Sequence, residues 1–516
     1  MTNEPLENNI PDQDPDQPLG SRNRVEQIAS LFLNLFQNEQ ANARAVSDKM
    51  AALFTACTAD ELLELDEQVR WLYDWNVGEA WTKLRAQDVS KLPATERSRG
   101  LVLGLASFHG NGYVREAAVE ALDNLHDGTE LPFLLIRNND WVAKVQLRAK
   151  AATEQRVREK RFGFSVLNLD LLFRLLNKRR AEHSALVTMV VAQLLQPEQR
   201  TTLLNLLTGS NRFVRRTLFR LGIEISGFDQ ELIQVGLKST DPVVRLWSIR
   251  RVSVFQKQDL VELLKQVEND SFLPVRREVL QIQLAHFPER AEQYLHAALL
   301  DHRATIRELA RFHFRKIGFI NFSAIYRELL KEQAKVAIAG LGESGAEGDA
   351  ELILPYVGSK RSSVRKAAVR AVGRLAASKY AELLTDCLSD DSPSVSREAA
   401  RVLTEQVLQV GTHRLWSLFQ QDQRQHVKLA VLSLVINFSI WIGLPLFIEA
   451  AANSDSRIAA FAKNYCERLY NRVFTRPSGE QQLLISQSLD KYHDSLDPIF
   501  RASVRNWLSL RGADHG

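Results

Sequence analysis

Apolar residues recur at helical spacing along most of the chain, in blocks separated by short polar turns. In the block that begins at Asp241, apolar positions run to Val252, and a second apolar stretch runs from Leu260 to Val267. Asp241 suits the N-cap of the first helix because its carboxylate can accept from free N–H groups, and Pro242 suits the first helical position, where no N–H is needed. The block therefore predicts two short helices joined by a turn.

A Val-Arg or Ile-Arg pair marks this block and gives its period. Four successive copies are Val214-Arg215, Val244-Arg245, Val275-Arg276 and Ile306-Arg307. Their arginines are 30, 31 and 31 residues apart. Two short helices cannot bury an apolar face alone, whereas a stack of such pairs buries a continuous core. The period therefore predicts an all-α protein, a right-handed α-solenoid of about ten two-helix repeats with helical caps.

The clearest blocks run from Asn111 to Ala118 and from Ser363 to Ala371, each with a polar turn, a Val-Arg pair and small residues at helical spacing. This arrangement resembles the HEAT-like repeat over roughly residues 101–470. The period is shorter than that of standard HEAT repeats and is similar to the short, bacterial-type repeats of the phycobilisome-lyase-like HEAT families. The resemblance implies the fold and leaves the function open, because these families include scaffolds, transport adaptors, lyases and DNA-binding enzymes.

The remaining segments complete the predicted organisation. Residues 1–20 are acidic and rich in proline, which predicts a disordered tail without the features of a signal peptide, and hence a cytoplasmic protein. Residues 21–100 and 471–516 are expected to form helical caps around a solenoid at 101–470. Residues 429–448 carry no charge and reach membrane-spanning length. The repeat phase favours two buried helices there with a turn at Gly443–Pro445, and the membrane alternative stays open.

Two further stretches admit both a structural and a functional interpretation. Trp71, Tyr73, Trp75 and Trp81 form an aromatic cluster. Trp71 and Trp75, one helical turn apart, are expected to fill the core where the N-terminal cap meets the first repeat, with an aromatic binding platform as the alternative. Residues 156–164 combine basic side chains with phenylalanines and interrupt the period. They predict an exposed insertion, with a grip on nucleic acid as the alternative.

Charge is distributed unevenly along the chain. Residues 1–100 hold 10 basic against 17 acidic side chains, and residues 200–320 hold 19 basic against 13 acidic ones. A basic central segment favours an acidic partner. The chain lacks phosphate-binding loops and nucleophile motifs, and its three cysteines and eleven histidines lack metal-ligand spacing. We therefore expect no catalytic residue, no metal and no cofactor.

The central arginines fall into two predicted groups. A structural ladder, in which an arginine reaches an aspartate or carbonyl of an adjacent repeat, is expected at Arg115, Arg215, Arg245, Arg276, Arg307 and Arg365. Partner binding is expected at Arg216, Arg220, Arg250, Arg277, Arg311 and Arg315. Positions 303, 307, 311 and 315 place four arginines on one helix face, so a counter-charge must come from the next helix or from a partner.

These observations predict a non-catalytic protein-binding scaffold or adaptor that holds an acidic protein partner on a concave basic surface. Two alternatives remain at the level of the sequence. One is a protein that binds nucleic acid without sequence specificity, and the other is a lyase or chaperone-like enzyme. The oligomeric state is left open.

Overall fold

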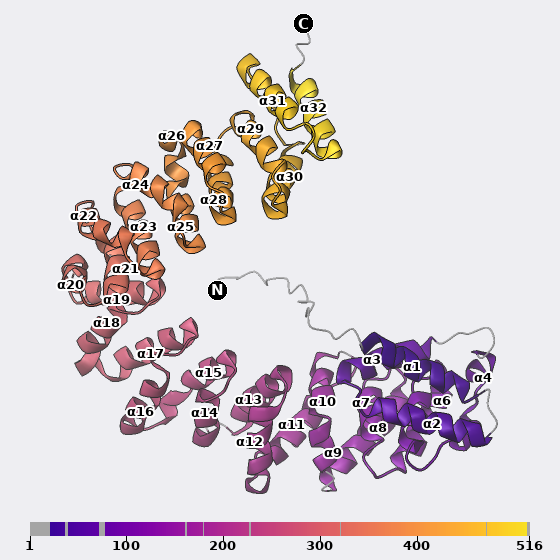
Figure 1. Ribbon diagram of the computed structural model, residues 1–516. Helices are drawn as coiled ribbons and strands as arrows, with labels where there is room; N and C mark the ends of the chain where they lie inside the picture. Colours follow the sequence, from indigo (N-terminus) through magenta and orange to yellow (C-terminus); the bar gives the residue numbers. More distant parts are fainter. Residues whose placement is uncertain are drawn as a thin grey trace. The chain divides into compact units, whose positions relative to one another are not determined.

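Regular structure in the computed structural model of the chain is helical throughout the residues that it describes, which are 21–36, 40–71, 78–159, 162–178, 180–226, 229–319, 321–470 and 472–512. The predicted tail at 1–20 lies outside these residues. The chain divides into two compact units, residues 1–278 and residues 279–516. Within each unit the helices follow one another in antiparallel pairs (Figure 1), which confirms the predicted all-α array.

The first unit begins with a group of helices that precede the repeats. They are α1 (Ser21–Asn34), α2 (Gln40–Phe54), α3 (Ala59–Arg70) and α4 (Gly78–Thr82). The paired helices that follow are α5 (Arg99–Ala106), α6 (Gly112–Asp123), α7 (Leu131–Arg137), α8 (Ala143–Arg158), α9 (Phe162–Leu167), α10 (Leu169–Arg174), α11 (Ser184–Leu194), α12 (Arg200–Gly209), α13 (Arg212–Ser226), α14 (Gln230–Leu237), α15 (Pro242–Ile249) and α16 (Lys257–Val267). Helix α17 (Leu273–His286) crosses the division between the units.

The second unit continues the pattern to the end of the described chain. Its helices are α18 (Ala291–Leu299), α19 (Ala304–Lys316), α20 (Phe322–Glu328), α21 (Ala334–Ser344), α22 (Asp349–Ile353), α23 (Ser362–Ala376), α24 (Ala381–Asp386), α25 (Pro393–Leu403), α26 (Val407–Val410), α27 (Thr412–Gln421), α28 (Gln425–Val435), α29 (Ile440–Ala451), α30 (Ser456–Leu469), α31 (Gly479–Lys491) and α32 (Pro498–Gly512). Short 3-10 turns lie between several of them.

The second helix of each pair packs against the second helix of the next pair, which makes one layer of each unit. In the first unit this row contains α6, α8, α11, α13 and α15, and in the second unit it contains α19, α21, α23, α25, α28 and α30. Close approach between helices depends on small residues. A Cβ atom on Gly104 of α5 would lie 2.3 Å from the ring of Phe133 on α7, so only glycine fits at that crossing.

The predicted helix start at Asp241 is confirmed. The Asp241 carboxylate accepts from the backbone N–H of Val243 at 2.9 Å, and Pro242 is the first residue of α15. Thr58 and Glu61 form a capping box at the start of α3. The Thr58 hydroxyl accepts from the backbone N–H of Glu61, and the Glu61 carboxylate accepts from the backbone N–H of Thr58. These caps set where the helices begin and so keep the repeats in register.

The uncharged stretch at 429–448 forms parts of two helices, α28 and α29, as expected. The turn between them lies at Ile436–Ser439, so the predicted turn at Gly443–Pro445 is wrong, and Pro445 lies inside α29. Pro445 is the sixth residue of α29, so the helix lacks the bond that an N–H at this position would make to the carbonyl of Trp441. Among the described residues, none of the helices combines the length and the apolar character needed to cross a bilayer.

Two sequence interpretations at the N-terminal end need correction. Trp81 is buried, with its ring 5.0 Å from Phe32, but Trp71 is 79% exposed and does not fill the core; Tyr73 and Trp75 lie outside the described residues. The missed feature is that α3 ends at Arg70, which leaves Trp71 beyond the helix.

The start of the predicted basic insertion is also part of the core. Helix α8 runs to Arg158, and Arg156 on it is buried. The Arg156 guanidinium donates to Glu130 at 2.7 Å and to Asp123 at 2.9 Å, and it also donates to the carbonyl of Leu125 at 2.6 Å. Arg156 therefore joins α8 to the loop before α7 and is unavailable to nucleic acid.

Candidate docking groove between the second helices

A ladder of arginine–aspartate pairs joins neighbouring repeats at a constant separation of 25 residues. Arg115 donates from Nε and Nη2 to the two carboxylate oxygens of Asp140 at 2.9 and 3.0 Å. Arg245 binds Asp270 in the same bidentate way at 2.6 and 2.8 Å. The same bidentate geometry joins Arg365 to Asp390 at 2.7 Å for both bonds. Each of the three aspartates also accepts a backbone N–H two residues further on.

These hydrogen bonds keep the ladder carboxyl groups ionised. Burial alone would raise the pKa of Asp140, but the hydrogen bonds from Arg115 and the charge of Arg137 hold that pKa below its ordinary value. The pKa of Asp270 and of Asp390 is lowered against the effect of burial in the same way, by Arg245 and by Arg365. The ladder therefore contributes to stability through charged, hydrogen-bonded pairs.

At one ladder position the aspartate is bound by Arg216 and not by the predicted Arg215. Arg216, which the sequence assigned to a partner, donates to Asp241 at 2.8 and 2.9 Å across 25 residues. Arg215, which was expected to take that carboxylate, donates instead to the Thr240 hydroxyl at 2.9 Å and to the Ser210 carbonyl at 2.8 Å. Both residues thus serve the repeat, and Arg216 is half-buried in it.

The other two central ladder arginines reach backbone carbonyls. Arg276 donates to the carbonyl of Asp270 at 2.5 Å. Arg307 donates to the carbonyl of Asp301 at 2.6 Å and, through Nε, to Glu343 on α21 at 3.0 Å. Glu343 therefore supplies part of the counter-charge that the arginine stripe on α19 requires.

Arg311 does not belong to a partner surface. Its side chain is 3% exposed, and it lies between Glu343, at 3.0 Å, and Glu308, at 2.6 Å. The prediction that it binds a partner is therefore wrong, because the counter-charge comes from the next helix and from its own helix. Arg315, one turn further, is exposed, 3.3 Å from Glu308.

Two of the predicted binding arginines meet at a groove between α13 and α15. The groove has a volume of about 450 Å³. Its apolar wall consists of Phe219, Ile223 and Trp247, of which the first two are buried. Its charged rim consists of Arg220, Arg250, Arg251 and Glu224, all exposed.

The rim carries more positive than negative charge. Arg250 is 3.3 Å from Glu278 on α17, whereas Arg220 and Arg251 make no ion pair with any described residue. Arg277, on α17, is likewise exposed and without an ion pair in the described part of the chain. The groove can therefore offer at least two uncommitted guanidinium groups beside an apolar wall.

Sequence analysis identified two of the groove's three arginines, Arg220 and Arg250, and missed its apolar wall. Trp247 fits the apolar pattern of the first helix in the block that begins at Asp241, and the structure leaves it half-buried at the groove. Arg251 lies directly after Arg250 and was not singled out for binding. The signal that could have found Arg251 is the absence of an acidic residue 25 positions later, a feature that it shares with Arg220 and Arg250.

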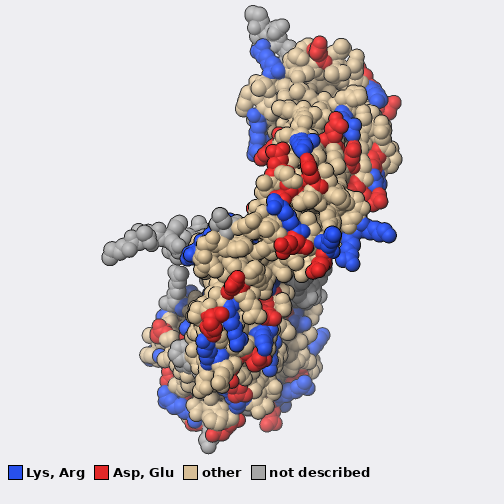
Figure 2. Space-filling view, turned by 90° about the vertical axis from the view of Figure 1, so that its left-hand side faces the viewer, with Lys and Arg blue, Asp and Glu red and all other residues tan. Residues whose placement is uncertain are grey.

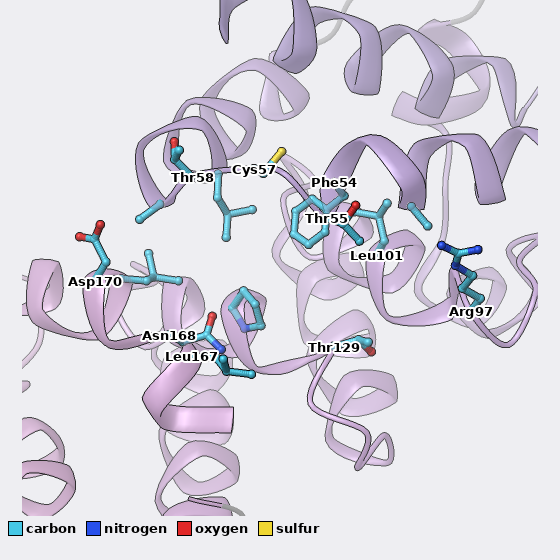
Figure 3. Close-up of a pocket in the computed structure, with 15 residues that line it drawn as sticks. Phe54, Thr55, Cys57, Thr58, Arg97, Leu101, Thr129, Leu167, Asn168 and Asp170 are labelled. Atoms are coloured by element: carbon cyan, nitrogen blue, oxygen red, sulfur yellow. The ribbon is translucent and has the colours of Figure 1, made fainter. Parts of the chain in front are cut away.

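A second cavity of about 460 Å³ lies between the N-terminal helices and the first pairs (Figure 3). Its walls come from α2, α3, α5, α7 and α10, with Phe54 and Leu101 facing its interior and with Arg97 and Asp170 at opposite ends of the view. Asp170 is engaged by Arg174 at 2.8 Å and by Asn211 at 3.1 Å. The cavity is mainly apolar, and its carboxylate is already neutralised.

Reactive chemistry is sparse in the described part of the chain. Burial raises the pKa of the Cys57 thiol to about 11, which leaves it protonated and unreactive at neutral pH. Among the described residues, every carboxyl group with a shifted pKa has that pKa lowered, as at Asp140. A general acid needs a raised pKa instead. Described histidine, cysteine and acidic side chains form no group arranged to hold a metal ion.

Many exposed charges elsewhere in the described chain are paired with a neighbour of opposite charge. On the face drawn in Figure 2, basic and acidic side chains are interspersed. Pairs such as Lys379 with Glu351, 3.0 Å apart, and Arg414 with Asp386, 2.6 Å apart, show how exposed charges neutralise one another.

Residues 329–404 match the family model for HEAT repeats. The chain contains HEAT repeats. The matched segment covers α21, α23 and α25, the helices that pack side by side in the second unit. No match was found among curated proteins. The HEAT match leaves the expected short subtype of the repeat undecided.

Several solved structures are similar to the chain at low identity. A structure of Kap95p with RanGDP is 12% identical with a TM-score of 0.35, and the match covers 88% of this chain and 66% of that one. A structure of Kap121p is 14% identical with a TM-score of 0.28, covering 96% and 55%. The condensin Cnd3–Cnd2 subcomplex of S. pombe is 14% identical with a TM-score of 0.31, covering 95% and 88%. Because the chain spans less than two thirds of the first two proteins and the scores are low, no partner or activity is transferred from them.

Proposed function

We propose that the protein is a non-catalytic binding scaffold that holds an acidic segment of a protein partner in the groove between α13 and α15. The observation that carries this proposal is the pairing of an apolar wall, formed around Trp247, with the uncommitted guanidinium groups of Arg220 and Arg251. Aromatic and arginine side chains together are typical of the residues that dominate binding energy at protein interfaces. Surplus positive charge selects acidic partners and speeds their encounter.

The repeat architecture supports the same interpretation. Second helices packed in a row present successive side chains along one extended surface, which suits a linear segment better than a compact ligand. We include Arg250 and Arg277 in the proposed surface because both are exposed on neighbouring second helices. Arg315 belongs to the other unit, and its predicted role in partner binding stays separate from this groove. Arg216 and Arg311 are left out because their charges are already neutralised.

Peptide binding tests the proposal directly. A fluorescent peptide with a leucine flanked by glutamates should bind, and the same peptide with lysines in place of the glutamates should not. The double variant Arg220→Glu/Arg251→Glu should weaken binding by about tenfold or more, because both contacts become repulsive. Arg212→Glu is the matched control, since Arg212 is exposed at the start of the same helix and away from the groove. Equal affinity in the double variant and the control would overturn the proposal.

The same assay distinguishes nucleic acid from an acidic protein segment as the ligand of the groove. Duplex DNA replaces the peptide, and affinity is followed as the salt concentration rises. A protein that neutralises several phosphates loses affinity steeply with log salt. Tight DNA binding with a steep slope, lost in Arg220→Glu/Arg251→Glu, would favour nucleic acid over an acidic protein segment as the ligand of this groove.

A further inference from the structure

A second aromatic residue is held at the surface of the first unit by cations. Trp141 is 50% exposed, immediately before α8. The guanidinium of Arg115 lies over its ring at 4.2 Å from the centroid, that of Arg70 at 4.3 Å and that of Arg180 at 5.5 Å. Each stack contributes about 0.5–2 kcal/mol, depending on how far it is shielded from water. Trp141 is therefore a fixed aromatic side chain, in contrast to a surface tryptophan that rotates freely.

The cations around Trp141 outnumber the carboxylates. Arg70 and Arg137 share Asp66, at 2.8 and 2.6 Å, and Arg137 and Arg115 share Asp140, each at 2.9 Å. Three buried or half-buried arginines thus share two aspartates. The shortage shows in the hydrogen bonding, because Nη1 of Arg70 and Nε of Arg137 are buried without an acceptor.

Arg180 adds a further positive charge that remains accessible. It is exposed, it lies beside Trp141, and its side chain makes no ion pair with the described residues. Counting only side chains that the structure describes, the cluster therefore carries a surplus of two positive charges around an exposed indole. An indole presents a positive edge, including its N–H, which suits an anionic acceptor better than a cation.

We infer that Trp141 and Arg180 form a second docking point for an acidic protein segment, separate from the groove at Trp247. A glutamate or aspartate side chain would pair with the guanidinium of Arg180 while its methylene groups pack on the exposed edge of Trp141. The inference rests on the proposed function only in that the partner is acidic. Trp141 belongs to the same compact unit as the groove, so one partner can engage both points.

Site-resolved binding tests the inference. The full chain is prepared with 5-fluorotryptophan, and its fluorine signals are followed as the glutamate–leucine peptide is added. Trp141→Phe and Trp247→Phe assign the two signals of interest among those of the eight tryptophans. We expect both signals to shift. Arg180→Gln should weaken the response at Trp141 by about fivefold or more and leave that at Trp247 unchanged.

Lys178→Gln is the matched control, because Lys178 is exposed two residues away and does not contact the ring of Trp141. If Lys178→Gln weakens the Trp141 response as much as Arg180→Gln does, the effect is general charge attraction and the docking point is refuted. A Trp141 signal that does not move while Trp247 responds refutes it as well, leaving the groove intact. Loss of the Trp247 response alone would refute the groove and leave the Trp141 docking point standing.

Discussion

Removing Asp140 should destabilise the first unit far more than removing Asp270, although both aspartates occupy the same place in the repeat. Each accepts two bonds from an arginine 25 residues earlier and one from a backbone N–H two residues later. Two things differ: Asp140 also accepts from Nη1 of Arg137 at 2.9 Å, and the pair of Arg115 with Asp140 is more deeply buried. Arg115 and Asp140 are both 0% exposed, whereas Arg245 is 14% and Asp270 is 6% exposed.

The expected magnitudes follow from what each substitution leaves behind. Asp140→Ala leaves the guanidinium of Arg115 buried with only the carbonyls of His109 and Gly110 as acceptors. Stranding one partner of a fully buried pair costs about 3–5 kcal/mol. Asp270→Ala frees a guanidinium that reaches solvent, so about 1–2 kcal/mol is expected, part of it from the lost backbone bond.

Hydrogen exchange measures this difference locally, which matters because repeat arrays do not unfold in one step. Amide protection in α6 and α8 reports Asp140→Ala, and protection in α15 reports Asp270→Ala. For each variant the exchange rate is compared with that of the same helix in the unsubstituted protein. A gap of about 3 kcal/mol corresponds to an acceleration roughly a hundredfold greater for Asp140→Ala than for Asp270→Ala. Equal losses of protection would show that neither burial nor the bond from Arg137 sets the strength of the ladder, and the reasoning would fail.

Three further outcomes are expected. Arg311→Ala should lower the stability of the second unit by about 1–2 kcal/mol, because Glu343 loses one arginine partner but keeps Arg307, whereas Arg315→Ala should change the thermal midpoint little. Because the pKa of Asp390 is lowered in the folded state, its contribution is present above about pH 4 and is lost as the pH falls further, so Asp390→Asn should flatten the acid limb of a pH–stability curve. Gly104→Ala should cost about 1–3 kcal/mol in urea unfolding because its Cβ meets the ring of Phe133.

The sequence predicted those features that depend on local chemistry. The start of α15 at Asp241 and Pro242 follows from capping rules, and the period follows from the recurring Val-Arg pair. Contacts between helices were predicted only in part: the ladder pairs of Arg115, Arg245 and Arg365 were expected, and others were missed. The burial of Arg311 requires Glu343, which lies 32 residues away on another helix, and no helical spacing within α19 points to it.

The broken period near residue 160 misled the analysis for a related reason. A stretch that departs from the repeat was interpreted as an exposed insertion, yet α8 continues to Arg158 and buries Arg156. A basic residue at that place looks solvated in the sequence because its acceptors, Glu130 and Asp123, precede it by 26 and 33 residues. Both the length of α8 and the choice of acceptors for Arg156 therefore depend on tertiary contacts.

The separation of 25 residues offers a rule that identifies structural arginines in such repeats. Arg115, Arg216, Arg245 and Arg365 have an aspartate 25 residues later and bind it. The exposed arginines Arg220, Arg250, Arg251 and Arg277 are followed at that distance by Arg245, Val275, Arg276 and His302. The loop that receives the ladder arginine thus offers these four no carboxylate. Excess basic residues in the sequence therefore overstate the basic surface. An aspartate at this distance identifies a ladder arginine, but its absence does not make an arginine available, because Arg156 and Arg311 lack it and are still paired within the protein.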